Sequence, residues 1–189
     1  MKVYLNLRKT LVISTALLFL CVGCSDRLVR ASDFSNSDVM FAQMMIPHHE
    51  QALNMSELAI EISKNPDVIS MAKRIQKEQS PEIEQMKLWL DDGTSHHLGH
   101  DMMEDFESSG RGMMGMLDDG DFEELRNSQG IEFDRLFLKA MIAHHEGAID
   151  MAEMIVDSKN SEAAKLGKSI IDTQLAEINE MKTLLLNLK

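Results

Sequence analysis

The feature that most constrains the fold of this 189-residue chain is an internal duplication rich in histidine and methionine. Segment 45–55 reads M-I-P-H-H-E-Q-A-L-N-M and segment 141–151 reads M-I-A-H-H-E-G-A-I-D-M, so that seven of eleven positions are identical. A second block of matches follows in each copy. It pairs Gln79, Glu82, Ile83, Met86 and Lys87 with Gln174, Glu177, Ile178, Met181 and Lys182. The chain is therefore predicted to build the same structural unit twice.

Each copy is predicted to form a helical hairpin, because apolar residues recur at helical spacing and only 3 residues of the chain are proline. The expected helices cover about 37–63 and 67–90 in the first copy, and about 131–157 and 162–188 in the second. Pro47 and Pro81 lie inside two of these helices. We expect each proline to bend its helix without breaking it, because the helical pattern continues without interruption over the equivalent stretches of the second copy.

Two such hairpins bury their apolar faces by packing on each other, which predicts an all-α four-helix bundle. Segments 37–92 and 131–189 supply the hairpins, and 37–189 is expected to be one domain. The linker between them, 93–130, contains seven glycines. This composition predicts a flexible segment rather than a long helix, although a short helix at 122–126 is compatible with it.

The first residues are predicted to be an export signal. Three basic residues precede a 12-residue apolar run that ends shortly before Cys24, an order typical of secretory signals and too short for a transmembrane helix. Segment 1–23 is expected to be removed, with Cys24 as a lipidation site and 24–36 as a tether. A plain signal peptide that is cut slightly later is the alternative. Lipidation at Cys24 would leave no free thiol, so metal ligation would fall to His, Met, Asp and Glu.

The histidines and methionines are the candidate metal ligands. At 100° per residue, His48 and Met55 share one stripe of their helix, and His49 lies on the other side of Met45. If the His48 stripe faces the stripe that contains Glu82, each hairpin brings imidazole, thioether and carboxylate or amide groups to one point. The predicted metal ligands are Met45, His48, His49, Met55, Met86, Met141, His144, His145, Met151 and Met181. Auxiliary candidates are Met44, Glu82, Glu177, His96, His97, His100, Met102, Met103, Met113, Met114 and Met116.

The softness of these ligands narrows the choice of metal. Thioether sulfur binds Cu(I), and by the same reasoning Ag(I), whereas imidazole also accepts Cu(II). Copper is therefore the predicted metal, with Cu(I) favoured and no organic cofactor expected. Di-iron bundles use Glu-x-x-His pairs, but Met45 and Met141 stand where those glutamates would be. The linker holds three His and five Met within 21 residues, which suggests transient copper capture, unless it is a polar loop with incidental Met.

Several residues also have structural interpretations. Both His-His pairs could form a hydrogen-bonded layer of the bundle without any metal. Met40, Met71 and Met154 are expected to fill the core, as buried methionine usually does. Glu50 and Glu146 either orient a neighbouring histidine or lie on a solvated face.

The repeated motif M-I-x-H-H-E-x-A-x-x-M, followed by Q-x-x-E-x-x-x-M, resembles the domain of unknown function 305 family, which includes CopM-type periplasmic copper-binding proteins. The resemblance covers about 38–90 and 132–188. It implies a ferritin-like four-helix bundle that binds copper in the cell envelope through the His and Met positions of both copies. Ala143 stands where the first copy has Pro47, so the two copies differ at the residue before their His-His pairs.

Together these features predict an exported, lipid-anchored protein that sequesters or transfers copper in the cell envelope. Its expected partners are metal ions and an envelope copper exporter or chaperone, with the lipid anchor as its contact with the membrane. The net charge of −12 disfavours nucleic acid as a partner. A metal-free interaction module is the main alternative. A copper-dependent envelope oxidase is a weaker one, because the chain has no nucleophile triad, phosphate loop or H-E-x-x-H motif.

Overall fold

The computed structural model describes residues 34–91 and 115–188. The predicted signal, Cys24 and the first part of the linker lie outside the described residues. The linker candidates outside them are His96, His97, His100, Met102, Met103, Met113 and Met114.

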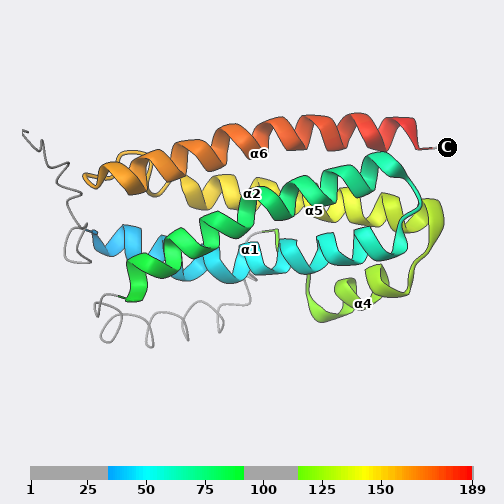
Figure 1. Cartoon of the computed structure of the whole chain (residues 1–189), viewed down its shortest axis with the longest axis horizontal. Coiled ribbons are helices and arrows are strands. Elements are labelled where there is room, and N and C mark those ends of the chain that lie inside the picture. The colour runs from blue at the N-terminus through cyan, green and yellow to red at the C-terminus, as the bar shows by residue number, and fades with distance from the viewer. Residues whose placement is uncertain (1–33, 92–114, 189) are drawn as a thin grey trace, which may run out of the picture.

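The described chain is a bundle of two antiparallel helical hairpins, which confirms the all-α prediction (Figure 1). The first hairpin consists of α1 (Asn36–Ile62) and α2 (Pro66–Asp91), and the second of α5 (Gly130–Ala152) and α6 (Ser161–Asn187). Helices α1 and α5 form the main contact between the hairpins. A short helix, α4 (Asp119–Asn127), packs on α5. Residues 115–129, which belong to the linker predicted to be flexible, are therefore ordered.

The helices begin and end at residues that satisfy free backbone groups. Ser35 and Asp38 form a capping box at the start of α1, and the Asn160 side chain accepts hydrogen bonds from two backbone N–H groups at the start of α6. Both prolines lie inside unbroken helices, Pro47 in α1 and Pro81 in α2, which confirms that neither breaks its helix.

The prediction that one helix extends to residue 157 is wrong, because α5 ends at Ala152. Residues 153–157 form a tighter turn, in which Ile155 N–H bonds to the carbonyl of Ala152 and Ser158 N–H to that of Ile155. Such hydrogen bonds between residues three apart are common at the C-terminal end of an α-helix. Ile155 remains fully buried there, so the apolar periodicity continues beyond the end of the α-helix.

Two matching hydrogen bonds tie the ends of the hairpins together. Ser63, in the turn of the first hairpin, donates to Asp134 of α5 (2.5 Å), and Ser158, in the turn of the second, donates to Asp38 of α1 (3.0 Å). Both aspartates are at least 96% buried. These pairs were not recognised from the sequence, and they fix α1 antiparallel to α5.

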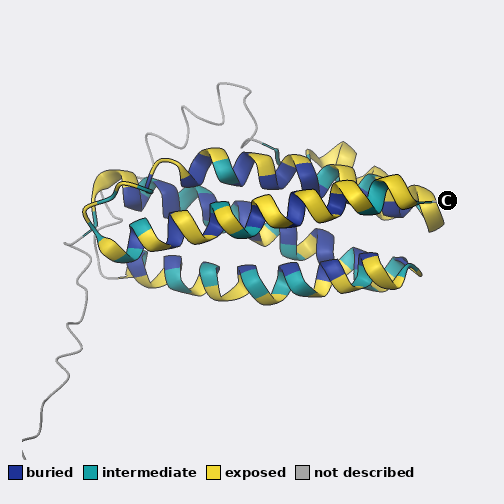
Figure 2. Cartoon of the chain, turned by 90° about the horizontal axis from the view of Figure 1, so that it is seen from above, coloured by how far each residue is buried: buried dark blue, intermediate teal, exposed yellow. Residues whose placement is uncertain are grey.

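The apolar side chains form two clusters toward opposite ends of the bundle, and buried residues line the inward faces of the helices (Figure 2). One cluster contains Phe133 and Phe137, and the other contains Phe41 and Trp89. None of the helices in the described ranges is both long and apolar enough to cross a membrane.

Candidate metal centre

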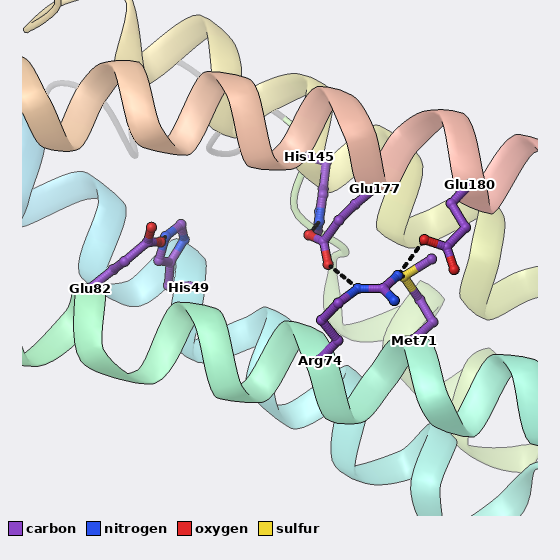
Figure 3. Close-up of polar contacts among 7 residues, drawn as sticks. All are labelled: His49, Met71, Arg74, Glu82, His145, Glu177 and Glu180. Carbon is purple, nitrogen blue, oxygen red and sulfur yellow. Dashed lines mark hydrogen bonds and ion pairs between the residues drawn. The ribbon is translucent and has the colours of Figure 1, made fainter.

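Each hairpin holds one imidazole–carboxylate pair. His49 Nε2 lies 2.9 Å from Glu82 Oε2, and His145 Nε2 lies 2.8 Å from Glu177 Oε2 (Figure 3). In the neutral form of each ring, an Nε2–H group that donates to the carboxylate leaves the lone pair on Nδ1. Both rings are fully buried. A carboxylate that orients a histidine in this way is typical of the surroundings of metal-binding imidazoles.

The other two histidines meet between the hairpins. The rings of His48 and His144 have their centroids 3.6 Å apart, with 35° between their planes, and both are fully buried. The four imidazoles, all from α1 and α5, therefore lie in one layer across the middle of the bundle. Glu82 of α2 and Glu177 of α6 lie at its two ends.

This arrangement corrects the predicted helix faces. His49 faces the partner helix of its own hairpin and meets Glu82, whereas His48 faces the other hairpin. Helix α1 packs against both α2 and α5, and successive residues point 100° apart, so two adjacent histidines serve two different neighbours. The helical wheel gave this divergence correctly, but it could not determine which neighbour lies on which side.

The predicted sets of methionines are also wrong in one respect, because they do not stay within one hairpin. Met45 and Met86 share a buried cluster with Met151 of the second hairpin, which we name the first thioether group. Met141 and Met181 share the other cluster with Met55 of the first hairpin, which we name the second thioether group. The antiparallel packing of α1 on α5 brings opposite ends of the two repeats together. The groups lie on either side of the imidazole layer, and all six side chains are at least 94% buried.

Burial determines the charge state of the central imidazole. It lowers the pKa of His144 well below the ordinary value of 6.5, and the nearby rings of His48, His145 and His49 lower that pKa further. An interaction with the backbone of His48 acts weakly in the other direction. His144 is therefore neutral at pH 7 and can offer a lone pair to a metal ion.

Several buried polar atoms of this layer lack a hydrogen-bond partner among the described residues. They include Nδ1 of His49, Nδ1 of His145, and both amide atoms of Gln79 and Gln174. Leaving one such group unpaired costs about 1–3 kcal/mol, so a layer with several of them is better suited to binding a ligand than to holding the bundle together. Within the described ranges, no three His, Cys, Asp or Glu side chains are already placed to hold a metal. A site preformed there must therefore include other donors, such as thioethers or amides.

The remaining candidates lie at the edges of this centre. Glu50 and Glu146 form ion pairs with Lys87 and Lys182 on the surface, which favours the solvated-face interpretation. Met116 lies half-buried beside α5, where it lines a cavity of about 270 Å³. Met44 and Met40 are half-buried, Met71 is part of the core, and Met154 is 37% exposed.

Arg74 is a neighbour of the centre that the sequence analysis missed. Its guanidinium reaches from α2 to α6, where Nε lies 3.6 Å from Glu177 and Nη2 lies 2.5 Å from Glu180 and 3.1 Å from the sulfur of Met71 (Figure 3). The equivalent position of the second copy, at the offset of 95, is Ser169. The carboxylate of Glu82 therefore has no matching arginine, and comparison of the repeats position by position would have shown this difference.

Fold and site together define a duplicated four-helix bundle with a buried layer of histidine between groups of methionine. The family model described as domain of unknown function (DUF305) matches residues 38–185, and the chain belongs to this family. No curated protein matches it in sequence.

Solved structures of the same fold include one copper-bound protein, CopM. A DUF305 protein from Streptomyces coelicolor, described as secreted, is 28% identical, with a TM-score of 0.72 over 80% of this chain and 93% of the other. A DUF305 fragment from Deinococcus radiodurans is 30% identical, with a TM-score of 0.69 over 82% and 98%. CopM in its Cu(I)-bound form is 31% identical, with a TM-score of 0.62 over 79% and 96%. CopM is also known in Cu(II)-bound and Ag-bound forms.

Proposed function

We propose that this chain binds copper, chiefly as Cu(I), in the buried centre formed by the imidazole layer and the two thioether groups. One observation carries the proposal. Among the described residues, Nδ1 of His49 and Nδ1 of His145 have no hydrogen-bond partner, and three buried thioethers lie on each side of their layer. The similarity to CopM, which binds copper and silver, supports the same choice of metal.

The donor set explains the preference for a soft ion. Thioether sulfur is a good ligand for Cu(I) and a poor one for Mg²⁺ or Ca²⁺, and imidazole suits copper in both oxidation states. Glu82 and Glu177 each hold one imidazole by its Nε2–H group, which leaves Nδ1 for the metal. The metal is the cargo of the protein, and the chain's own residues supply binding, orientation and exclusion of water.

The proposal extends to location and role. With the signal expected at 1–23 and lipidation expected at Cys24, the bundle would stand in the cell envelope on a tether. The His- and Met-rich linker would catch the ion and the bundle would hold it, for storage or for transfer to an envelope exporter or chaperone. Nothing in this scheme requires an enzymatic reaction.

A Cu(I) competition titration of the soluble form, residues 25–189, against a chromophoric chelator tests the proposal. Wild-type protein is expected to bind at least one Cu(I) tightly. A variant with His48, His49, His144 and His145 replaced by Ala is expected to lose that binding while its helices persist in circular dichroism.

Replacement of the surface carboxylates Glu50 and Glu146 by Gln is the matched control, and it should leave the affinity unchanged. Unaltered Cu(I) affinity in the four-histidine variant would overturn the assignment of the site. Absence of Cu(I), Ag(I) and Cu(II) binding by the wild type would favour the metal-free interaction module.

A further inference from the structure

Segment 115–118, which precedes α4, lies across the two central helices. The Gln51 side chain of α1 exchanges two hydrogen bonds with the backbone of Leu117: its amide nitrogen donates to the carbonyl (2.9 Å), and its amide oxygen accepts from the N–H group (2.8 Å). Gly115 lies against α5, where an added Cβ would be 2.9 Å from Cα of His144. The segment therefore contacts both α1 and α5 at the level of the imidazole layer.

The two repeats differ in sequence where this segment lies. Three positions of one helix stripe carry larger residues in the first copy than in the second: Met44, Pro47 and Gln51 against Ala140, Ala143 and Gly147. These positions are three and four residues apart, so they share one face of each helix. A small residue at 143 lets the backbone of Gly115 approach α5 closely, whereas the long side chain at 51 reaches the segment from α1. The difference between the copies thus matches the position of segment 115–118.

A cavity of about 270 Å³ lies between this segment and α5. Met116 and Leu117 line it from one side, and Ala140 and Ala143 line it from the other. A water molecule occupies about 30 Å³ in the liquid, so the cavity has room for several waters. Because Ala143 directly precedes His144 in the chain, the cavity lies at the level of the imidazole layer and outside it.

The lining of the cavity suits a soft cation. It contains the half-buried thioether of Met116, a group that binds Cu(I) well. Asp121 and Glu124 of α4 contribute two carboxylates and Lys139 of α5 contributes one ammonium group, and all three side chains are exposed. The cavity therefore opens to solvent, its charged groups favour a cation, and Met116 offers the ion a soft ligand.

The imidazole layer, in contrast, is closed to solvent. The side chains of His48 and His144 are fully buried, and their rings meet between α1 and α5. An ion can reach them only through a local opening of the molecule. The long helices pack against one another along their length, whereas the hydrogen bonds that join segment 115–118 to α1 come from the single side chain of Gln51. Parts with few contacts open at a lower cost than the core, so this segment can open while the helices stay packed.

We propose that this cavity is the port through which Cu(I) enters and leaves the bundle, with Met116 as a transient ligand and segment 115–118 as the gate. The proposal rests on the proposed function and adds a binding place outside the buried centre. The ion stays Cu(I) throughout, and only its ligands are exchanged: the thioether of Met116 replaces a ligand of the donor, and the ligands of the centre then replace Met116. Opening requires release of Leu117 from Gln51, and closure excludes water again.

The test is the rate at which the soluble form, residues 25–189, takes up Cu(I) from its coloured bicinchoninate complex, measured by stopped flow without oxygen. Gln51→Ala removes both hydrogen bonds to Leu117, and its uptake should be at least about fivefold faster. Met116→Leu removes the sulfur from the port, and its uptake should be at least about fivefold slower. The equilibrium affinity of both variants should stay within about twofold of the wild type, because a port changes uptake and release together.

Matched controls test whether these effects are specific to the port. Gln76→Ala removes a half-buried glutamine that donates to the carbonyl of Leu53, and Met154→Leu removes a thioether that is 37% exposed. Both variants should take up Cu(I) at the wild-type rate. Arg74→Ala releases the ion pairs between α2 and α6, which lie on another side of the bundle. Faster uptake in Arg74→Ala, with wild-type uptake in Gln51→Ala, would place the entry between α2 and α6 and refute the port.

A second readout measures access to the layer without metal. Modification of His48 and His144 by diethyl pyrocarbonate, followed by peptide mass spectrometry, should be faster in metal-free Gln51→Ala than in the wild type. It should be unchanged in Gln76→Ala. Wild-type uptake in either Gln51→Ala or Met116→Leu, or a loss of affinity that accompanies the slower uptake of Met116→Leu, would refute the port alone. Absence of Cu(I) binding by the wild type would instead refute the proposed function.

Discussion

At the scale of single residues, burial governs the chemistry of the centre. The imidazoles are fully buried, and those of His49 and His145 are oriented by carboxylates. His144 has no carboxylate partner within the described residues, and its pKa is lowered mainly by burial. His144 is therefore a neutral nitrogen donor at pH 7, and its ring is fully buried.

The lowered pKa of His144 predicts that the metal-free protein is less stable in acid. Below about pH 6.5, the unfolded chain takes up a proton at this residue, whereas the folded protein does so only well below that pH. Stability should thus fall as pH drops from about 6.5 toward the folded pKa, by up to about 1.4 kcal/mol per pH unit from this residue. Above pH 6.5 the residue is neutral in both states and contributes no slope.

Urea unfolding of wild type and His144→Gln at pH 5 and pH 7, without metal, measures this effect. The variant should lose less stability between pH 7 and pH 5 than the wild type. The same loss in both proteins would show that other groups cause the acid sensitivity.

At the scale of secondary structure, the segment before α4 is fixed across the two central helices. Leu117 donates its N–H group to the Gln51 side chain of α1 (2.8 Å) and accepts a hydrogen bond from it (2.9 Å). Gly115 lies against α5, where an added Cβ would be 2.1 Å from the carbonyl oxygen of Ala143. This close approach places the segment beside His144, and it occurs at the position where the first repeat has Pro47.

Replacement of Gly115 by Ala should release this segment. Its φ of +80° and its contact with backbone atoms both exclude a side chain, and the strain should cost about 1–3 kcal/mol locally. Hydrogen exchange at the Leu117 N–H group should speed up, while the four long helices keep their protection. Gly120→Ala is the control, because a Cβ there meets only a side-chain oxygen of Asp118 at 3.2 Å. Unchanged exchange at Leu117 would contradict the proposed anchoring of this segment by Gly115.

At the scale of the whole molecule, the two hairpins depend on each other. Crossed hydrogen bonds from Ser63 to Asp134 and from Ser158 to Asp38 fix their relative orientation. The same orientation gives each thioether group two methionines from one hairpin and one from the other. A single hairpin is therefore missing part of each group.

Because each thioether group contains methionines from both repeats, we predict energetic coupling between methionines of different repeats. In double-mutant cycles for Cu(I) affinity, Met45→Leu and Met151→Leu should be coupled by about 1 kcal/mol or more, because they alter one binding group. Met45→Leu and Met55→Leu lie on the same helix but in different groups, and their effects should add. The reverse pattern would show that each hairpin binds metal by itself.

The sequence by itself determined the duplication, the helices to within a few residues except for the end of α5, and the identity of most candidate ligands. These follow from local periodicity and from residue chemistry, which a single chain segment already contains. Tertiary structure alone decided that His49 faces Glu82 while His48 faces His144, and that Met55 and Met151 belong to the opposite repeat's group. Those assignments depend on the direction in which two hairpins pack. Local periodicity cannot specify that direction, because parallel and antiparallel packing bury the same faces of the same helices.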